Sequence, residues 1–279
     1  MSLYKPSELK AFLEENQKKA NKRLSQNFLI DKNILDKIIQ LNMAYKAFPA
    51  LEIGPGPGAL TEQLLQAGFK VTAIELDQQF AELLKKRLTP FYPQLEIIQD
   101  DFLKTDLKVV LQKSPLWSVV ANLPYHITSK ALIKLLMNSH SFSSLTLMVQ
   151  KEFFDRVMET SGKDYGIINI LCRLCSSKME GFKVSASCFY PAPRVDSAVL
   201  HLQLNCPHSP AKMMAFYEFL KTAFVSRRKK LISNLQDKYS ITLLKECFKT
   251  YELDENIRVE ALNPEQYFQL FNFLSHSAS

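Results

Sequence analysis

The chain has 279 residues, of which 47% are hydrophobic and 23% charged, and its formal net charge is +7. These proportions are typical of a globular protein and argue against long disordered stretches. No run of 18 apolar residues occurs, so we expect no membrane-spanning helix and no membrane partner. The first residues lack the apolar stretch of a signal peptide, and the five cysteines are irregularly spaced. Both features favour a cytoplasmic protein with reduced thiols.

The basic excess is uneven along the chain. Residues 1–50 carry nine basic and five acidic side chains, and residues 201–250 carry nine and three. Residues 51–100 are acidic, with four basic and seven acidic side chains. Basic flanks around an acidic middle favour a polyanionic partner, although charge alone is equally compatible with a merely soluble basic protein. We expect the basic residues at 1–30 to form a helical segment.

From about residue 48, short apolar runs alternate with longer amphipathic stretches. This alternation indicates βαβ units and a mostly parallel sheet covered on both faces. Two later runs, at 182–189 and 197–204, are too close together for a crossover helix, so we expect them to pair antiparallel. The sequence therefore predicts an α/β fold. The five earlier strand-like runs are FPALEI (48–53), KVTAIE (70–75), LEIIQ (95–99), LWSVVA (116–121) and LTLMVQ (145–150).

The segment NCPHSP (205–210) has the composition of a linker. The chain beyond it has helical spacing and no strand signal. We therefore expect a main domain at 1–206 and a small helical domain at 207–279.

Cys172 and Cys175 form a C-x-x-C pair within the apolar segment GIINILCRLC. Residues three apart share one face of a helix, so two packed thiols are the favoured interpretation. Zinc would need a second ligand pair, and none has suitable spacing, so we expect no metal site.

The first motif with chemical content is LEIGPGPGAL (51–60), a strand that runs into a glycine-rich turn and then a helix. Glycines at this point, of which Gly54 is the first, let the backbone pass close to a ligand. Glu75 follows 21 residues later, where an acid can accept hydrogen bonds from ribose hydroxyls. The pattern predicts an adenosine-containing cofactor, with an ordinary tight turn as the alternative. Pro55 and Pro57 cannot donate N–H groups to a pyrophosphate, which favours S-adenosylmethionine over NAD.

The second motif is IQDDFL (98–103), just after the third strand-like run. An acid at the carboxyl edge of the sheet could accept a hydrogen bond from the cofactor adenine amine. Asp100 and Asp101 compete for that role, and a solvated loop pair is the alternative.

The third motif, VVANLPYHI (119–127), places Asn122 to Tyr125 after the fourth strand-like run. It matches the (Asn/Asp/Ser)-Pro-Pro-Tyr type motif of methyltransferases that act on planar exocyclic amines. The lone pair of such an amine is delocalised into its ring. An Asn carbonyl and a backbone carbonyl that accept both amine hydrogens would free it for attack on a sulfonium methyl. The Tyr125 ring would stack on the extruded base.

The fourth motif is CFYPAPRVDSAVL (188–200). Phe189 precedes two prolines and could supply a second aromatic face against the base. The alternative is a core aromatic at a hairpin.

The fifth motif is FVSRRKKLISNL (224–235), with four consecutive basic residues, Arg227, Arg228, Lys229 and Lys230. Apolar residues flank them at helix spacing. We expect one helix face to dock on the protein and the other to contact phosphates, with a solvated face as the alternative.

Taken together, the chain resembles the ribosomal RNA adenine dimethyltransferase family of the KsgA/RsmA type. The resemblance covers nearly the whole sequence. It implies a seven-stranded Rossmann-like methyltransferase domain, a small helical C-terminal domain and the cofactor S-adenosyl-L-methionine, converted to S-adenosyl-L-homocysteine. It also implies dimethylation of two adjacent adenosines near the 3′ end of small-subunit (16S) ribosomal RNA. The matching segments are RLSQNFLID (23–31), EIGPGPGALT (52–61), AIELD (73–77), ANLPYHITS (121–129), FYPAPRVDSAV (189–199) and FVSRRKKL (224–231).

Carried over by position, the resemblance assigns roles to individual residues. Asn27 and Leu29 would lie against the cofactor and Gly54 would line it. Glu75 would hold the ribose and Asp101 the adenine amine, although IQDD departs from the more usual pattern and leaves Asp100 open. Asn122 would contact both the methionine part and the target amine. We expect a monomer that acts on the small-subunit precursor.

Three alternatives remain at this stage. The erythromycin-resistance methylases share most of these motifs and act on large-subunit RNA. An NAD-dependent oxidoreductase would explain the glycine fingerprint and Glu75 but not the motif from Asn122 to Tyr125. An RNA-binding transcription or assembly factor would have no use for an intact Asn122.

Overall fold

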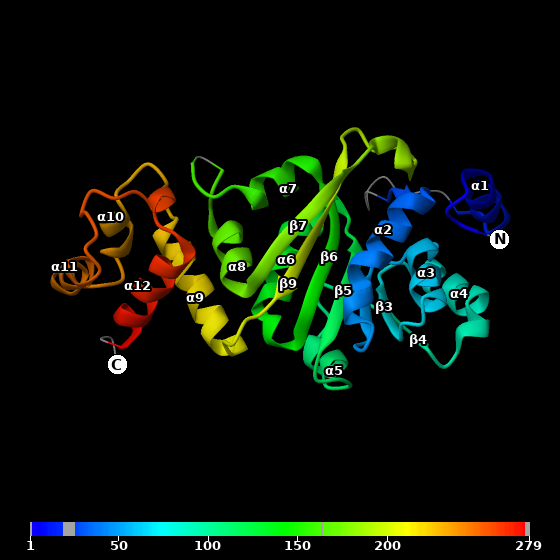
Figure 1. Cartoon of the computed structure of the whole chain (residues 1–279), viewed down its shortest axis with the longest axis horizontal. Coiled ribbons are helices and arrows are strands. Elements are labelled where there is room, and N and C mark those ends of the chain that lie inside the picture. Colours follow the sequence, from blue (N-terminus) through cyan, green and yellow to red (C-terminus); the bar gives the residue numbers. More distant parts are fainter. Residues whose placement is uncertain (1, 19–25, 163, 277–279) are drawn as a thin grey trace.

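The computed structural model describes residues 2–18, 26–162 and 164–276. Its centre is a seven-stranded sheet in the order β4-β3-β2-β5-β6-β9-β7 (Figure 1). The five strands on one side are parallel, which confirms the predicted sheet: β2 (Ala50–Ile53), β3 (Val71–Glu75), β4 (Leu95–Gln99), β5 (Trp117–Asn122) and β6 (Phe142–Gln150).

The other two strands close the sheet antiparallel, as predicted. They are β9 (Ser197–Leu204), paired with β6, and β7 (Ser176–Val184), paired with β9. The predicted strand at 182–189 is displaced, because β7 starts directly after a helix and ends at Val184. Its last residues form a separate strand, β8 (Phe189–Tyr190), which pairs with β1 (Phe28–Leu29).

Helices cover both faces of the sheet, which explains why the central strands read as continuous apolar runs. Residues of α2 (Lys32–Asn42), α3 (Ala59–Gln66) and α4 (Gln78–Arg87) share one core cluster with one face of the sheet. The second face packs against another set. That set comprises α5 (Leu107–Leu111), α6 (Thr128–Met137), α7 (Lys151–Met158) and α8 (Ile167–Cys175).

Cys172 and Cys175 lie in α8 and are fully buried. Burial raises the pKa of the Cys172 thiol to about 12, so it stays protonated. This agrees with the prediction of two packed thiols.

The N-terminal segment is only partly helical. Helix α1 (Pro6–Glu15) packs in a small cluster with Phe28 and Phe80. Residues 28–29 are a strand rather than part of a helix, because their backbone pairs with β8. The stretch 19–25, which includes the RLS of the RLSQNFLID motif, lies outside the described residues.

The C-terminal part of the described chain contains α9 (Pro210–Ala223), α10 (Leu231–Leu235), α11 (Ile241–Thr250) and α12 (Pro264–His276). In Figure 1 these helices form a lobe beside the sheet, next to α8. Helices α9 and α12 contact α8, and α9 also contacts α6. The lobe and one face of the sheet therefore share a single core cluster.

Candidate cofactor and target-base site

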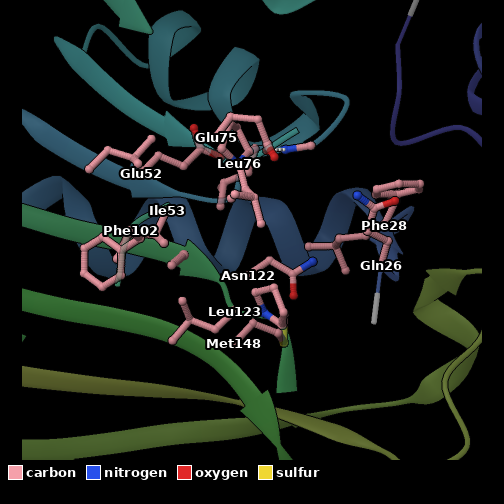
Figure 2. Close-up of a pocket in the computed structure, with 18 of the residues that line it drawn as sticks. Gln26, Phe28, Glu52, Ile53, Glu75, Leu76, Phe102, Asn122, Leu123 and Met148 are labelled. Atoms are coloured by element: carbon pink, nitrogen blue, oxygen red, sulfur yellow. Dashed lines mark hydrogen bonds between the residues drawn. The ribbon is translucent and has the colours of Figure 1, made fainter. Parts of the chain in front are cut away.

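A cavity of about 380 Å³ opens at the carboxyl edge of the parallel strands. After β2 the chain adds β3 and β4 on one side and then returns to place β5 on the other. Loops leave in opposite directions at such a switch point and open a crevice, which is where open α/β sheets bind ligands. Residues 26–29 line one side of this pocket. Figure 2 shows Asn122 in the pocket, with Glu75 and Leu76 on one side and Gln26 and Phe28 on another.

The glycine loop after β2 is shaped by residues with left-handed backbone. Gly54 has φ +66° and nothing within 4 Å of where a Cβ would stand, so its pocket side is open to a ligand. Gly58 has φ +92° and is the N-cap of α3, where a Cβ would lie 2.3 Å from the Leu84 side chain. A side chain at Gly58 would therefore force the Leu84 side chain to shift, and it would also strain the left-handed backbone.

The three glycine N–H groups of this loop are already used within the protein. Gly54 N–H donates to Ile74 O at 2.9 Å, and Gly58 N–H donates to Pro55 O at 3.0 Å. Gly56 N–H donates to Glu75 Oε2 at 2.8 Å. With Pro55 and Pro57 lacking donors, the loop is poorly equipped to cradle a pyrophosphate, as an NAD site must.

Glu75, at the end of β3, lines the pocket and is only 5% exposed. Its second carboxylate oxygen, Oε1, accepts a hydrogen bond from Asp77 N–H at 2.8 Å. Burial raises the pKa of Glu75, and its hydrogen bonds from Asp77 and Gly56 oppose that shift. Glu75 therefore fixes the glycine loop as well as facing the pocket.

Both acids of the loop after β4 line the pocket. Asp100 is engaged at both oxygens, because Oδ2 accepts from the Thr105 hydroxyl at 2.7 Å and Oδ1 from Asp101 N–H at 2.8 Å. The Thr105 bond is the main reason that the pKa of Asp100 is lowered. Asp101 accepts from Leu103 N–H through Oδ1 at 2.9 Å, while its Oδ2 lies 4.0 Å from Lys104 Nζ. The Oδ2 of Asp101 is thus held less tightly by the protein than either oxygen of Asp100, which both accept hydrogen bonds.

Lys134, which the sequence analysis missed, holds this acidic loop in place. From α6 its Nζ donates to Phe102 O at 2.7 Å, Leu103 O at 3.1 Å and Thr105 O at 2.6 Å. Burial lowers the pKa of Lys134, and the charges of the nearby aspartates oppose that shift. No local motif marks this lysine, because its acceptors are backbone carbonyls about 30 residues earlier in the chain.

Asn122, the last residue of β5, points its side chain into the pocket (Figure 2). Its Nδ2 donates to Asn27 O at 3.0 Å. This bond fixes the amide orientation and leaves Oδ1 as the acceptor. Leu29 also lines the pocket and is 5% exposed. The QNFL and NLPY segments are therefore brought together, although Asn27 and Asn122 are 95 residues apart in the sequence.

The two predicted aromatic residues have different environments. Tyr125 lines the pocket in a 3₁₀ turn, Tyr125–Ile127, and burial raises the pKa of its hydroxyl. Phe189 is 3% exposed, packs in the sheet core with Leu29 and is not among the described residues that line the pocket. It therefore presents no open face for a base. This environment fits the alternative of a core aromatic at a hairpin, and the stacking role of Phe189 stays a prediction.

Glu52 is a pocket residue that the sequence analysis overlooked. It lies on β2, is 1% exposed, and its Oε2 accepts no hydrogen bond from the described residues. Burial raises its pKa to about 8, and the charge of Glu75 contributes to the shift. An acid in a buried strand is rare enough to have been a signal. The open side of Gly54 and this unpartnered oxygen fit a cofactor with positively charged groups, as S-adenosylmethionine has, because such a charge would favour the ionised form of the buried carboxyl.

The predicted helix over the basic run is wrong. Residues 227–229 form a turn, and Lys230 is extended and pairs with Arg258. Helix α10 starts only at Leu231. The reason is tertiary, because the Asn234 side chain donates to Ala223 O and Ser226 O and so bends the chain between α9 and α10.

The four basic residues also divide into two kinds. The Arg227 guanidinium donates to the carbonyls of Gly162 and Tyr165, so it ties the lobe to the loop before α8. The other three line a shallow depression that we call the basic groove. Its residues are Arg228, Lys229, Lys230, Ser233, Gln236, Asn256 and Arg258.

The family model described as "Ribosomal RNA adenine dimethylase" matches residues 17–276. The chain belongs to this family. Among its curated relatives, "Ribosomal RNA small subunit methyltransferase A" of Protochlamydia amoebophila is 38% identical over 99% of both chains. The protein of the same name from Chlorobium luteolum is 39% identical over 91% of this chain and 89% of its own.

Solved structures of the same fold agree with this family assignment. A dimethyladenosine transferase from Plasmodium falciparum aligns with a TM-score of 0.69 at 25% identity, covering 90% of this chain and 98% of its own. The 23S rRNA methyltransferase ErmE aligns with a TM-score of 0.63 at 26% identity, covering 89% and 100%. The predicted Rossmann-like methyltransferase fold is thereby confirmed. In the described residues, no helix is long and apolar enough to cross a membrane, and no cluster of metal-ligating side chains occurs.

Proposed function

We propose that this chain dimethylates the exocyclic amines of two adjacent adenosines near the 3′ end of small-subunit (16S) ribosomal RNA. The observation that carries the proposal is the fixed orientation of Asn122 at the pocket edge, with Nδ2 held by Asn27 O and Oδ1 left to accept. Membership of the rRNA adenine dimethylase family supplies the substrate class. The curated relatives named for the small subunit reach 36–39% identity, whereas ErmE reaches 26%.

The pocket residues would hold S-adenosylmethionine, which supplies an electrophilic sulfonium methyl and leaves as S-adenosylhomocysteine. Glu75 would accept hydrogen bonds from the ribose, and Gly54 leaves room for close approach. Asp101 is favoured over Asp100 for the adenine amine because both oxygens of Asp100 are engaged. Leu29 and Asn27 would close the side of the site, and Glu52 would face the positively charged part of the cofactor.

The target amine would be activated by two acceptors. Asn122 Oδ1 would accept one amine hydrogen. Pro124 O is not available for the second, because it accepts from Ile127 N–H at 3.1 Å and from the Thr128 hydroxyl at 3.3 Å. The carbonyl of Leu123 is therefore the better candidate. Hydrogen bonds to both amine hydrogens would draw the nitrogen toward tetrahedral geometry. Its lone pair would then leave conjugation with the ring and become free to attack the methyl group. The Tyr125 ring would stack on the extruded target base.

The division expected at residues 206–207 would then separate two tasks. The sheet domain would hold the cofactor and the target base. The lobe would bind RNA phosphates through Arg228, Lys229 and Lys230, and Arg227 would connect the two. Pocket and groove belong to one chain, so a cytoplasmic monomer acting on the small-subunit precursor suffices for this account.

Labelled-methyl transfer to purified ribosomal subunits that lack the modification tests the proposal. Transfer to the small subunit and none to the large subunit is the expected result. Preferential transfer to the large subunit would replace the proposal with the erythromycin-resistance type. A thermal-shift titration separates the cofactor classes, since a ligand that binds only the folded state raises its stability. S-adenosylmethionine should stabilise the chain, and NAD should not.

A further inference from the structure

Ser197 is brought to the catalytic edge by the antiparallel strand β9. The parallel strands β5 and β6 end at this edge, and β9 begins there because it runs the opposite way. Gln150, the last residue of β6, pairs with Ser197, the first residue of β9. Ser197 and Asn122 therefore lie at the same edge of the sheet, although β6 separates their strands.

The Ser197 hydroxyl contacts the pocket through Tyr125. The two hydroxyl oxygens are 2.8 Å apart, and Ser197 is fully buried. Tyr125 lines the pocket and is partly exposed. This hydrogen bond holds the hydroxyl end of the Tyr125 ring, whose orientation is otherwise set by rotation about the Cα–Cβ and Cβ–Cγ bonds. It therefore links the turn after β5 to a strand two places away in the sheet.

Ser197 is the fixed partner of this pair. Its backbone pairs with Gln150 on one side and with Val184 on the other. The preceding residue, Asp196, is held as well, because its carboxylate accepts from Ala186 N–H at 2.9 Å and its carbonyl from Lys151 N–H at 3.0 Å. Tyr125, by contrast, lies in a single 3₁₀ turn.

We infer that Ser197 is a positioning residue that sets the ring plane of Tyr125 for stacking on the target base. The inference rests on the proposed function, in which Tyr125 meets the base. Ser197 does not itself line the pocket among the described residues. Without the bond, the ring samples other orientations, so a bound base spends less time aligned for attack. Loss of the bond should therefore reduce kcat more than it raises KM for RNA.

A double-mutant cycle tests this coupling. Ser197→Ala and Tyr125→Phe each remove one hydroxyl and keep the ring. We expect each to lower kcat about 3- to 10-fold, the effect of losing one ordinary hydrogen bond. The double variant should be no slower than the slower single variant, and Ser197→Thr should recover kcat to within about twofold, since it restores the hydroxyl. Independent effects that multiply in the double variant would overturn the inference.

Ser144→Ala is the matched control. Ser144 is a fully buried serine of β6 whose hydroxyl has no partner among the described residues. Its substitution removes a strand hydroxyl without touching Tyr125, so kcat should not change. If Ser197→Ala does not fold, Tyr125→Phe still measures the loss of the bond from the other side.

A readout without RNA separates this inference from the proposed function. Ring carbon NMR signals of Tyr125, assigned by their loss in Tyr125→Phe, should move in Ser197→Ala and stay in Ser144→Ala. Unmoved signals would overturn the inference even if rRNA methylation is observed. Moved signals in a chain that methylates no rRNA would refute the proposed function and leave the Ser197–Tyr125 anchor standing.

Discussion

The cofactor pocket and the basic groove lie in different parts of the chain and are built in different ways. In the pocket, polar groups are tied to the protein: Glu75 accepts two backbone N–H groups, and Asn122 donates to Asn27 O. In the groove, Arg228, Lys229 and Lys230 are exposed side chains in and beside a turn. The comparison teaches that the polar groups of the pocket are held by the protein before a ligand arrives, whereas the groove offers charges that are exposed to solvent.

This contrast matches the two proposed ligands, a methyl-donor cofactor in the pocket and RNA in the groove. A methyl transfer needs reacting atoms held within a narrow range of distance and direction, which rigid partners provide. RNA phosphates are spread along a backbone, and flexible cations bind them through charge without reading sequence. Variants in each region test whether the pocket and the groove act separately.

Asn122→Ala should reduce turnover more than any other variant of the pocket. It removes the acceptor that matters most as the amine nitrogen gains positive charge. By analogy with the loss of one oxyanion-hole donor, turnover should fall about 10²- to 10³-fold while RNA affinity changes little. Single-turnover methyl transfer and a separate RNA-binding assay measure the two quantities.

Asn122→Asp is the informative comparison, because it keeps an acceptor oxygen and loses the N–H that donates to Asn27 O. It should retain more activity than Asn122→Ala. Near-normal turnover in Asn122→Ala would show that the amine-activation account is wrong.

Glu75→Ala should weaken cofactor binding without affecting the groove. The carboxylate would make charge-assisted hydrogen bonds to the ribose, and it also fixes Gly56. We expect a loss of about 2–3 kcal/mol in S-adenosylmethionine binding by calorimetry. RNA binding without cofactor should be unchanged. An unaltered cofactor affinity would show that Glu75 does not bind the cofactor.

Glu52 should make the free energy of unfolding of the chain depend on pH. Its pKa is raised to about 8 in the folded chain, from an ordinary value of 4.5, because it is buried. The folded state thus keeps a proton that the unfolded state loses, so the stabilisation is full below about pH 4.5 and declines as pH rises toward about 8. Each pH unit within that window should lower the free energy of unfolding by up to about 1.4 kcal/mol.

Glu52→Gln should remove this dependence, because glutamine does not titrate. Denaturant unfolding of both proteins at pH 5 and pH 8 measures the difference. From pH 5 to pH 8, the free energy of unfolding of the variant should increase relative to that of the wild type. Parallel pH profiles for the two proteins would show that Glu52 is already ionised when folded.

The smallest effect is expected in the groove. Replacing Arg228, Lys229 and Lys230 with Ala should flatten the salt dependence of RNA binding by about 0.7–0.9 in log–log slope per lost phosphate contact. Cofactor affinity should not change. A matched triple variant of exposed lysines far from the groove, Lys85, Lys86 and Lys108, should keep the wild-type slope. An identical slope in the groove variant would leave the lobe without an RNA contact.

Most of the pocket could be predicted because its residues follow strand ends. In a parallel sheet the carboxyl ends of neighbouring strands meet at one edge, so Gly54, Glu75, Asp101 and Asn122 converge once the strands are recognised. The basic run could not be placed in the same way. Its helical spacing was overridden by the contacts of Asn234 and Arg227 with residues outside the run.

The residues that the sequence did not reveal depend on contacts between distant segments. Lys134 binds carbonyls of the loop after β4, and Ser197 reaches Tyr125 across β6. The burial of Phe189 likewise depends on a long-range contact, because the β1–β8 pairing joins segments about 160 residues apart. Only Glu52 carried a local signal, as an acid in an otherwise apolar strand.

The most direct test of the central claim is the identity of the methylated nucleosides. Small subunits that lack the modification would be incubated with the chain and S-adenosylmethionine, and their RNA would be digested and analysed by mass spectrometry. The account predicts N6,N6-dimethyladenosine at two adjacent positions near the 3′ end, at a rate that Asn122→Ala lowers at least 100-fold. Methylation of another base, or dimethylation that persists at the wild-type rate in Asn122→Ala, would contradict it.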